Sequence, residues 1–247
     1  ILKKIKKPGT VENFLKAAEV FRKYEEINAR VFLLIGFPNE SYRQILDTIN
    51  VANEMDLDWC NVSILQPLPN TPIFNSMVQE GLIDTKNVEF TGMRYNTGRL
   101  GKNKKQIRDR LSGNFSEAFN VSNLDEVPSK AKLDDIWAYM NFHLNFKKLL
   151  EEKRKIKLIQ KLKYVENITD LISPENCLAL YFLGYLQNRI FGKIRTSTIS
   201  DLETRLEKFP YWKERFDQYN LSPEHLKTKS FNFNLISSET FERVSTQ

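Results

Sequence analysis

Two short apolar segments most constrain the fold of this chain, because each is too short for a typical helix. Ala29–Ile35 is continuously apolar after Arg30, and Asp58–Gln66 alternates apolar with polar residues. Branched residues in runs of this length predict β-strands. The segment between them has helical spacing, so the order strand, helix, strand predicts a βα repeat with a parallel sheet. We expect the first strand to be covered on both faces.

Local signals also predict where the helices begin. Thr10 is the expected N-cap of a helix ahead of the first strand. Ser41, with Gln44 three residues later, forms a capping-box pattern. Thr71 followed by Pro72 opens a third helix, because Pro at the first helical position loses no hydrogen bond.

The composition changes after the second predicted strand. From about Leu82 to Lys130 polar residues and Gly break every period, whereas Ile136–Leu162 has continuous helical spacing. Phe209–Phe216 is rich in aromatics, which we expect to pack against a core. The sequence thus predicts four parts: a βα part at 1–95, an irregular connection at 96–130, a mostly helical domain at 131–236 and a tail at 237–247.

The net charge of +6 raises the question of a nucleic-acid partner, because clustered Lys and Arg neutralise phosphates. The basic cluster Lys153–Lys163 is interleaved with apolar residues, which is typical of a solvated helix face. We therefore expect no nucleic-acid partner. An RNA-binding or RNA-modifying module using Lys102–Arg110, Tyr211 and Trp212 is one alternative.

Neither a run of about 18 apolar residues nor a signal-peptide layout occurs, so we expect a cytoplasmic protein without a membrane partner. Cys60 and Cys177 give neither a disulfide framework nor a zinc spacing, and both are expected to be small core residues. The chain begins with Ile in a helix-like segment, which favours a fragment truncated at its amino end.

In a parallel βα barrel, ligands bind at the carboxyl ends of the strands. After the first strand, residues 36–40 read Gly-Phe-Pro-Asn-Glu, and after the second, residues 66–72 read Gln-Pro-Leu-Pro-Asn-Thr-Pro. The first resembles the fifth-strand signature Gly-Phe/Leu-Pro-Gly-Glu-Ser/Thr of radical S-adenosylmethionine (SAM) enzymes, with Asn39 in place of the usual Gly. The second resembles their Pro-x-Pro-Gly-Thr-Pro exit from the sixth strand. Residues 2–10 resemble the helix start after the fourth strand, so the likeness covers about residues 1–82.

This resemblance implies an α/β fold: the C-terminal portion of a partial (β/α)6 TIM-like barrel, followed by a mostly α-helical domain. It implies a radical SAM enzyme that cleaves SAM reductively at a [4Fe–4S] cluster, for radical chemistry or methyl transfer on an unknown small molecule or peptide. An electron donor such as flavodoxin or ferredoxin is implied, and a cobalamin-binding domain ahead of the barrel is a further possibility.

The resemblance also defines what this chain lacks. The cluster of these enzymes is held by a CxxxCxxC loop, and two cysteines cannot supply three thiolates. The cluster ligands would therefore lie upstream of this chain, and we expect the fragment alone to be inactive, with no catalytic or metal-binding residue of its own. A non-catalytic docking scaffold is the other alternative.

Eight residues would contribute to SAM binding according to the resemblance: Leu34, Ile35, Gly36, Pro38, Glu40, Gln66, Pro67 and Leu68. The first two would line the adenine pocket, and the last three would offer backbone polar groups to the adenine edge. Glu40 is expected to order the turn rather than touch the chemistry. Lys6 or Lys7 could reach the methionyl carboxylate of SAM, although an exposed lysine is the commoner case.

Overall fold

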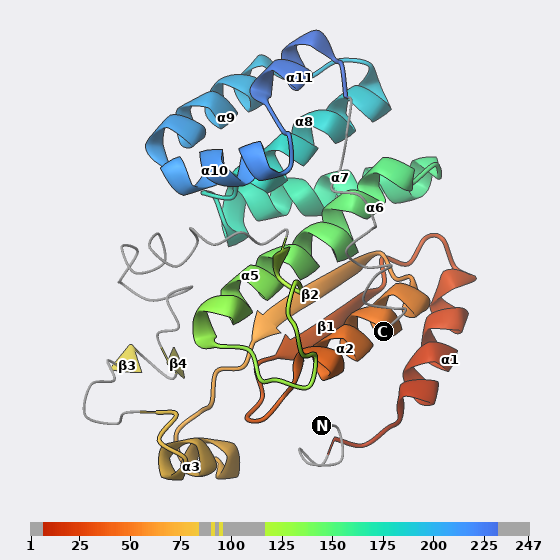
Figure 1. Ribbon diagram of the computed structural model, residues 1–247. Coiled ribbons are helices and arrows are strands. Elements are labelled where there is room, and N and C mark those ends of the chain that lie inside the picture. Colours follow the sequence, from red (N-terminus) through yellow and green to blue (C-terminus); the bar gives the residue numbers. More distant parts are fainter. Residues whose placement is uncertain (1–6, 84–89, 92–93, 96–116, 232–247) are drawn as a thin grey trace.

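The protein is described here by a computed structural model at residues 7–83, 90–91, 94–95 and 117–231. A small parallel sheet lies beside a long helix, and a layer of further helices lies above them (Figure 1). The elements of the first part are α1 (Val11–Arg22), β1 (Arg30–Ile35), α2 (Tyr42–Met55), β2 (Trp59–Ile64) and α3 (Pro72–Gln79), followed by the short antiparallel pair β3 (Phe90–Thr91) and β4 (Arg94–Tyr95).

The remaining elements are all helical. They are α5 (Lys130–Asn141), the π-helical turn η2 (Phe142–Phe146), α6 (Lys147–Glu151), α7 (Lys155–Asn167), the second π-helical turn η3 (Ile168–Ile172), α8 (Cys177–Phe191), α9 (Thr196–Lys208), α10 (Pro210–Gln218) and α11 (Pro223–Thr228). The described residues are therefore mostly helical with one parallel strand pair, which agrees with an α/β or helical class. A barrel is not seen among them.

The predicted helix starts are confirmed. Thr10 and Ser41 each form a capping box, in which the side chain accepts a hydrogen bond from the backbone of the third helical residue. Thr71 accepts from the backbone N–H of Phe74, and Pro72 takes the first position of α3. These caps fix the places where the chain leaves the strands and turns into helices.

The two strands pair in parallel, with Arg30 opposite Trp59 at one end and Ile35 opposite Ile64 at the other. One face of this sheet is buried against α2 and α5, since Ile35 and Cys60 are fully buried there and Val62 nearly so. Helix α1 packs beside α2 on the same face, through Ala18 and its neighbours.

The opposite face corrects a prediction, because β1 is not covered on both sides. On this face Phe32 is 78% exposed and Leu34 39% exposed. The continuous apolar run was a correct signal for a parallel strand. It could not show that one face of β1 is left largely open by the described helices.

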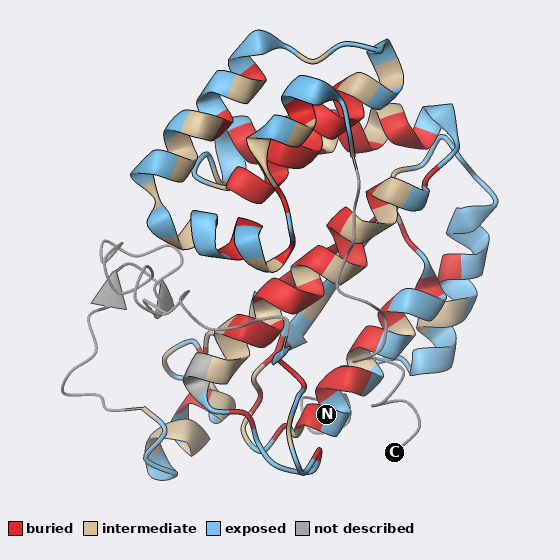
Figure 2. Cartoon of the chain, turned by 45° about the horizontal axis from the view of Figure 1, so that its top comes forward, coloured by how far each residue is buried: buried red, intermediate tan, exposed pale blue. Residues whose placement is uncertain are grey.

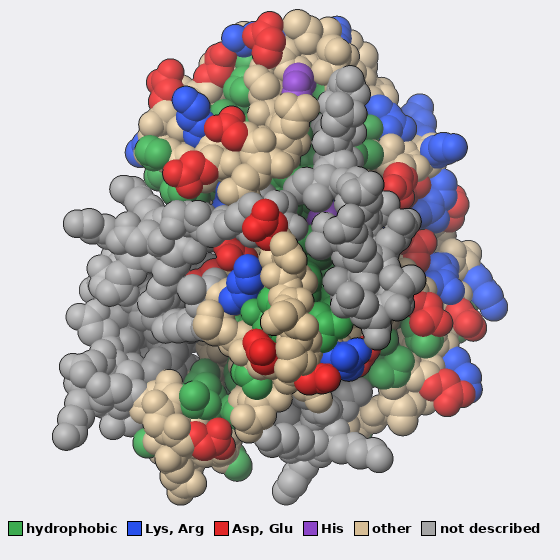
Figure 3. All heavy atoms as spheres, viewed as in Figure 1, with side chains coloured by type: hydrophobic (Ala, Val, Ile, Leu, Met, Phe, Trp, Pro, Cys, Tyr) green, Lys and Arg blue, Asp and Glu red, His purple; other side chains and the backbone are tan. Residues whose placement is uncertain are grey.

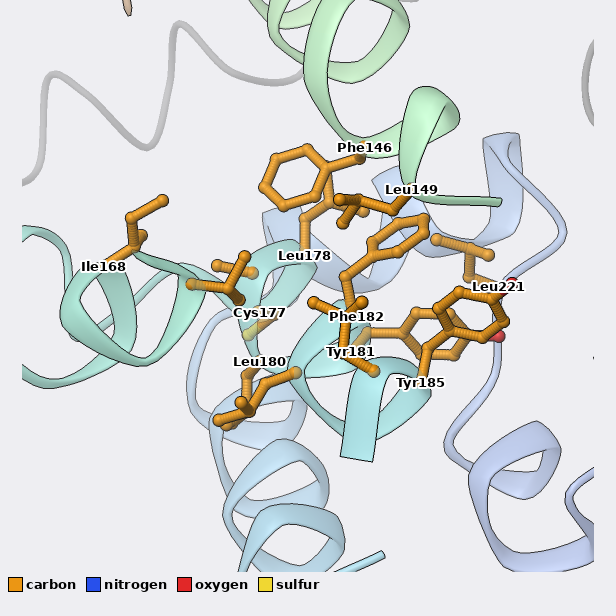
Figure 4. Close-up of a cluster of buried hydrophobic side chains, with 14 of the residues drawn as sticks. Phe146, Leu149, Ile168, Cys177, Leu178, Leu180, Tyr181, Phe182, Tyr185 and Leu221 are labelled. Carbon is orange, nitrogen blue, oxygen red and sulfur yellow. The ribbon is translucent and has the colours of Figure 1, made fainter. Parts of the chain in front are cut away.

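The helical part has its own core around α8, whose residues from Cys177 to Gln187 are all buried. Figure 2 shows buried residues concentrated along α5 and α8. Figure 4 shows Phe146 and Leu149 meeting Leu178 and Phe182 across this core. Phe216 is 2% exposed in the same cluster, so the prediction that the aromatic segment packs is confirmed.

One predicted helix is interrupted. The segment Ile136–Leu162 bends at Glu152, whose backbone is extended (φ −66°, ψ 125°). Its carboxylate accepts hydrogen bonds from the backbone N–H groups of Lys153 and Arg154, which provides these donors with a partner outside the helix. The outcome is one continuous helical stretch from α5 through η2 to α6, and a separate helix α7, where the periodicity predicted a single helix.

Three sequence predictions fall on residues outside the described part: most of the irregular connection, the basic cluster 102–110 and the tail 237–247. Among the helices that are described, none combines the length and apolar character needed to cross a membrane.

Candidate functional site at the carboxyl ends of the strands

The two segments that carry the sequence motifs leave the sheet at the same edge. The backbone N–H of Leu65 donates to the carbonyl of Ile35 over 2.7 Å, just beyond the last strand pair. Gly36 and Gln66 are thus the next residues at neighbouring strand ends. In parallel sheets this edge is where ligands bind.

The same turn follows both strands. Phe37 accepts from the backbone N–H of Glu40 (3.0 Å), with Pro38 and Asn39 between them. Further along, Leu68 accepts from the backbone N–H of Thr71 (3.2 Å), with Pro69 and Asn70 between them. In each turn the Asn has a left-handed backbone, with φ of 61° at Asn39 and 65° at Asn70. A Pro followed by a residue with a left-handed backbone is typical of a type II turn. Such a turn favours Gly or Asn at the left-handed position.

Glu40 organises the first turn. Its carboxylate is 2% exposed and accepts hydrogen bonds from the backbone N–H groups of Gly36 (2.5 Å) and Phe37 (3.1 Å). Burial raises the pKa of this carboxyl above its ordinary value, and the two backbone donors oppose that shift. The geometry agrees with the expectation that Glu40 orders the turn.

Gly36 is required at the strand exit for two reasons. Its φ is +83°, a region that other residues rarely adopt, and a Cβ there would lie 3.1 Å from Leu133 Cδ1 and 3.3 Å from Ile64 Cγ2. Leu133 of α5 therefore packs directly against the backbone of the first motif. The helical part of the chain forms one wall of this strand end.

Leu34 and Ile35, predicted to line one pocket, lie on opposite faces of the sheet, because successive strand residues alternate. Ile35 is fully buried in the core with α2, whereas Leu34 lies on the open face. Of these two residues, Leu34 is the one that can contact a ligand on the open face, and Phe32 is its neighbour there. The alternation of side chains along a strand is visible in the sequence, and it places Phe32 on the same face as Leu34. Phe32 was not among the predicted site residues.

The second strand end offers fewer backbone groups than predicted. Pro67 is buried and has no N–H, so it can present only its carbonyl. The carbonyl of Leu68 accepts from both the N–H and the hydroxyl of Thr71 (3.2 and 2.6 Å), although its side chain is 48% exposed. Gln66 is half-buried at the exit. Of the two lysines, Lys7 lies 5.8 Å from the ring of Phe14, and Lys6 is outside the described residues.

Helix α7 closes the amino-terminal half of the open face. The hydroxyl of Tyr164 donates to Asn61 Oδ1 over 3.0 Å, and the Tyr164 ring contacts Trp59 at 5.0 Å. The guanidinium of Arg30 lies 4.7 Å from the same ring. What remains open is the half toward the carboxyl edge, bordered by Phe32, Leu34 and the exposed Ser63. The contact between Tyr164 and Asn61 joins residues 103 positions apart, so no local signal predicts it.

The residues of this chain do not fit an iron–sulfur cluster. Cys60 and Cys177 are both buried, in separate cores, and burial raises the pKa of the Cys60 thiol to about 11 and that of Cys177 to about 12. Each is thus a protonated core residue. Within the described residues no three His, Cys, Asp or Glu side chains gather in a way that could hold a metal ion.

The charged side chains on the visible surface are of mixed sign. Figure 3 shows Lys and Arg interleaved with Asp and Glu along the edge of the molecule, without a continuous basic surface on the described part of that face. The sequence matches no protein-family model, and no solved structure matches the chain.

Proposed function

We propose that this chain is the C-terminal part of a radical SAM enzyme and that it supplies one wall of the SAM site. The observation that carries the proposal is the pair of Pro-Asn turns at the ends of adjacent parallel strands. At both positions where the resembled signatures have Gly, this chain has Asn with a left-handed backbone. Asn is the residue that best replaces Gly in that conformation, so the backbone at these two positions supports the proposal.

The open half of the sheet face suits a flat apolar group. Leu34 and Phe32 offer exposed apolar surface beside the strand ends, and the proposal gives the adenine edge to the backbone of Gln66 and Pro67. Adenine needs this combination of an apolar contact for its ring and backbone polar groups for its edge. Glu40 and Gly36 hold the first turn in place, so that the wall is preorganised.

The reductive step belongs to residues outside this chain. In enzymes of this kind a [4Fe–4S] cluster supplies the electron that cleaves SAM. The two buried cysteines cannot bind it, so its ligands would come from the upstream part of the polypeptide. Cobalamin dependence, methyl transfer and the identity of the electron donor are parts of the same proposal that rest on the sequence resemblance alone.

The test begins with the full-length reading frame. We expect a CxxxCxxC motif within about two hundred residues upstream of Ile1, which is roughly one domain length. The full-length protein, reconstituted anaerobically with iron and sulfide, should form 5′-deoxyadenosine from SAM when reduced with dithionite. The 247-residue chain treated in the same way should develop no stable cluster absorbance. Absence of the motif would favour the docking scaffold.

A variant pair locates the SAM wall. In the full-length protein, Leu34→Glu should weaken SAM binding roughly tenfold or more, because a carboxylate replaces an apolar contact. The matched control is Leu171→Glu, since Leu171 is 78% exposed and lies in the helical part. Equal affinities for the two variants, measured by calorimetry, would place SAM elsewhere.

A further inference from the structure

The outer edge of β1 carries backbone groups that have no partner within the described part of the chain. Ala29 and Ile35 direct their carbonyls to β2, where Asp58 and Leu65 donate to them. Because strand residues alternate, the backbone groups of Arg30, Phe32 and Leu34 point away from β2. None of these three makes a backbone hydrogen bond in the described part of the chain. A strand edge of this kind is a template for another strand.

The outer edge of β2 is sealed in a different way. The side-chain amide of Asn145 accepts from the N–H of Cys60 (2.8 Å) and donates to its carbonyl (2.9 Å). The indole N–H of Trp137 donates to the carbonyl of Val62 over 2.9 Å. These side chains of α5 and η2 take hydrogen bonds that a further strand would need. Among the described residues, β1 is therefore the edge at which a further strand can pair.

The position of α1 indicates the direction of growth. Helix α1 immediately precedes β1 and packs on the same face of the sheet as α2, with Arg22 donating to the carbonyls of Glu54 and Met55 at the end of α2. Strand–helix–strand connections in parallel sheets are right-handed in almost all cases. The connection from β1 through α2 to β2 follows this right-handed rule. Because α1 lies on the same face as α2, a right-handed connection through α1 would place the preceding strand beside β1, on its outer edge.

The exposed flank of α1 gives independent support. Phe14, Ala17 and Phe21 lie on one flank of α1. Phe14 packs partly against the small cluster that contains Ala18 and Met55, whereas Phe21 is 42% exposed. Arg22, on another part of the helix, contacts α2. The exposed part of this flank, at Phe21, is where the helix of a preceding βα unit would pack.

We propose that the outer edge of β1 and this flank of α1 bind a βα unit of the same polypeptide, encoded upstream of Ile1, whose strand pairs in parallel with β1. The inference rests on the sheet and the helix alone and does not require that the protein bind SAM. A second copy of this chain would pair with the edge in antiparallel orientation through a two-fold axis. Pairing with a second copy would not explain why α1 precedes β1 and packs on the same face of the sheet as α2.

Amide hydrogen exchange, followed by NMR or mass spectrometry, tests the proposal in the 247-residue chain and in the full-length protein. In the shorter chain the amides of Phe32 and Leu34 should exchange freely, while those of Leu33 and Ile35 are protected by β2. In the full-length protein the exchange of Phe32 and Leu34 should slow by about 100-fold or more. The Cys60 amide, held by Asn145, is the internal control and should be slow in both.

Three results would overturn the proposal. One is free exchange of Phe32 and Leu34 in the full-length protein, and another is a reading frame that provides no upstream strand. The third is protection in the shorter chain that rises with protein concentration while sedimentation shows a dimer, because the occupant is then a second copy. Cluster formation in the full-length protein is measured separately. If the β1 edge is protected but no cluster forms, this inference stands and the proposed function is wrong. If a cluster forms but the edge exchanges freely, the proposed function stands and this inference is wrong.

Discussion

Asn145 replaces a strand at the edge of β2, because its amide group bonds both the N–H and the carbonyl of Cys60. Asn145 is 2% exposed and lies in the π-helical turn η2. A π-helical turn inserts one extra residue into the helix and changes the direction in which the following side chains point. We infer that this turn aims the amide along the strand edge.

Replacing Asn145 with Ala should therefore be strongly destabilising. The variant leaves a buried donor and a buried acceptor of Cys60 without partners, which costs about 3 kcal/mol in the free energy of unfolding. Urea denaturation followed by circular dichroism measures this. Asn141→Ala, four residues earlier in α5, is the matched control, because it removes only a hydrogen bond to the carbonyl of Trp137 and should cost about 1 kcal/mol. Equal midpoints for the two variants would contradict the role given to Asn145.

The difference between Thr10 or Ser41 and Asn145 shows what could be predicted from the sequence. The first two cap helices through residues three positions away, so a local pattern is sufficient. Asn145 reaches a residue 85 positions away through an irregular helix, and no periodicity encodes this. The helix break at Glu152 was missed for a related reason, since its carboxylate competes for backbone N–H groups that the apolar spacing cannot reveal.

The sequence predicted which strand ends form the candidate site. It did not predict which face of the sheet each site residue lies on. The motifs correctly placed Gly36 and Gln66 at a shared edge. The assignment of Leu34 and Ile35 to one pocket ignored alternation, and the assignment of Leu68 ignored the competition of Thr71 for its carbonyl. The closure of half the open face by Tyr164 depends on how α7 packs, which is a tertiary relationship.

The left-handed asparagines should tolerate Gly and not Ala. Asn39→Ala and Asn70→Ala should each lower the free energy of unfolding by about 1 kcal/mol or slightly more. Ala is strained at positive φ and lacks the short polar side chain that lets Asn adopt this conformation. Asn39→Gly and Asn70→Gly should change stability by about 0.5 kcal/mol or less. The measurement is the urea midpoint of each variant. Asn53→Ala, in the exposed surface of α2, is the control and should be neutral or slightly stabilising. A similar loss for the Gly and Ala variants would show that the side chain, not the backbone, is what each turn needs.

The stability of the helical part should depend on pH through Glu152. Burial would raise the pKa of this carboxyl, but hydrogen bonds from Arg154 and the charge and hydrogen bond of Lys161 outweigh burial and lower it to about 2. Because the folded pKa lies below the unfolded value of 4.5, this stabilisation is fully present above pH 4.5 and is lost as the pH falls toward about 2. The loss amounts to about 2–3 kcal/mol.

Urea titrations at pH 3, 5 and 7 should detect this loss. Glu152→Gln should be less stable at pH 7 and should show a flatter pH dependence below pH 5. Glu12→Gln removes an ion pair whose two side chains are 68% and 74% exposed, so it is the matched control and should leave the pH dependence nearly unchanged. The same steep acid dependence in Glu152→Gln as in the parent chain would assign the effect to other carboxylates.

The effect of Phe32→Thr should depend on the length of the polypeptide. In the 247-residue chain Phe32 is 78% exposed, so a shorter residue that suits a strand should change the free energy of unfolding by about 0.5 kcal/mol or less. It should also lower self-association, measured by light scattering, because an exposed aromatic residue on an open sheet face favours it. In the full-length protein a strand beside β1 would contact Phe32 as a cross-strand neighbour, and the same substitution should cost about 1 kcal/mol. Val62→Thr is the matched control: Val62 is 4% exposed on the face covered by α2, so this variant should be destabilised by a similar amount at both lengths. The same small effect of Phe32→Thr at both lengths would mean that no strand pairs beside Phe32 in the full-length protein.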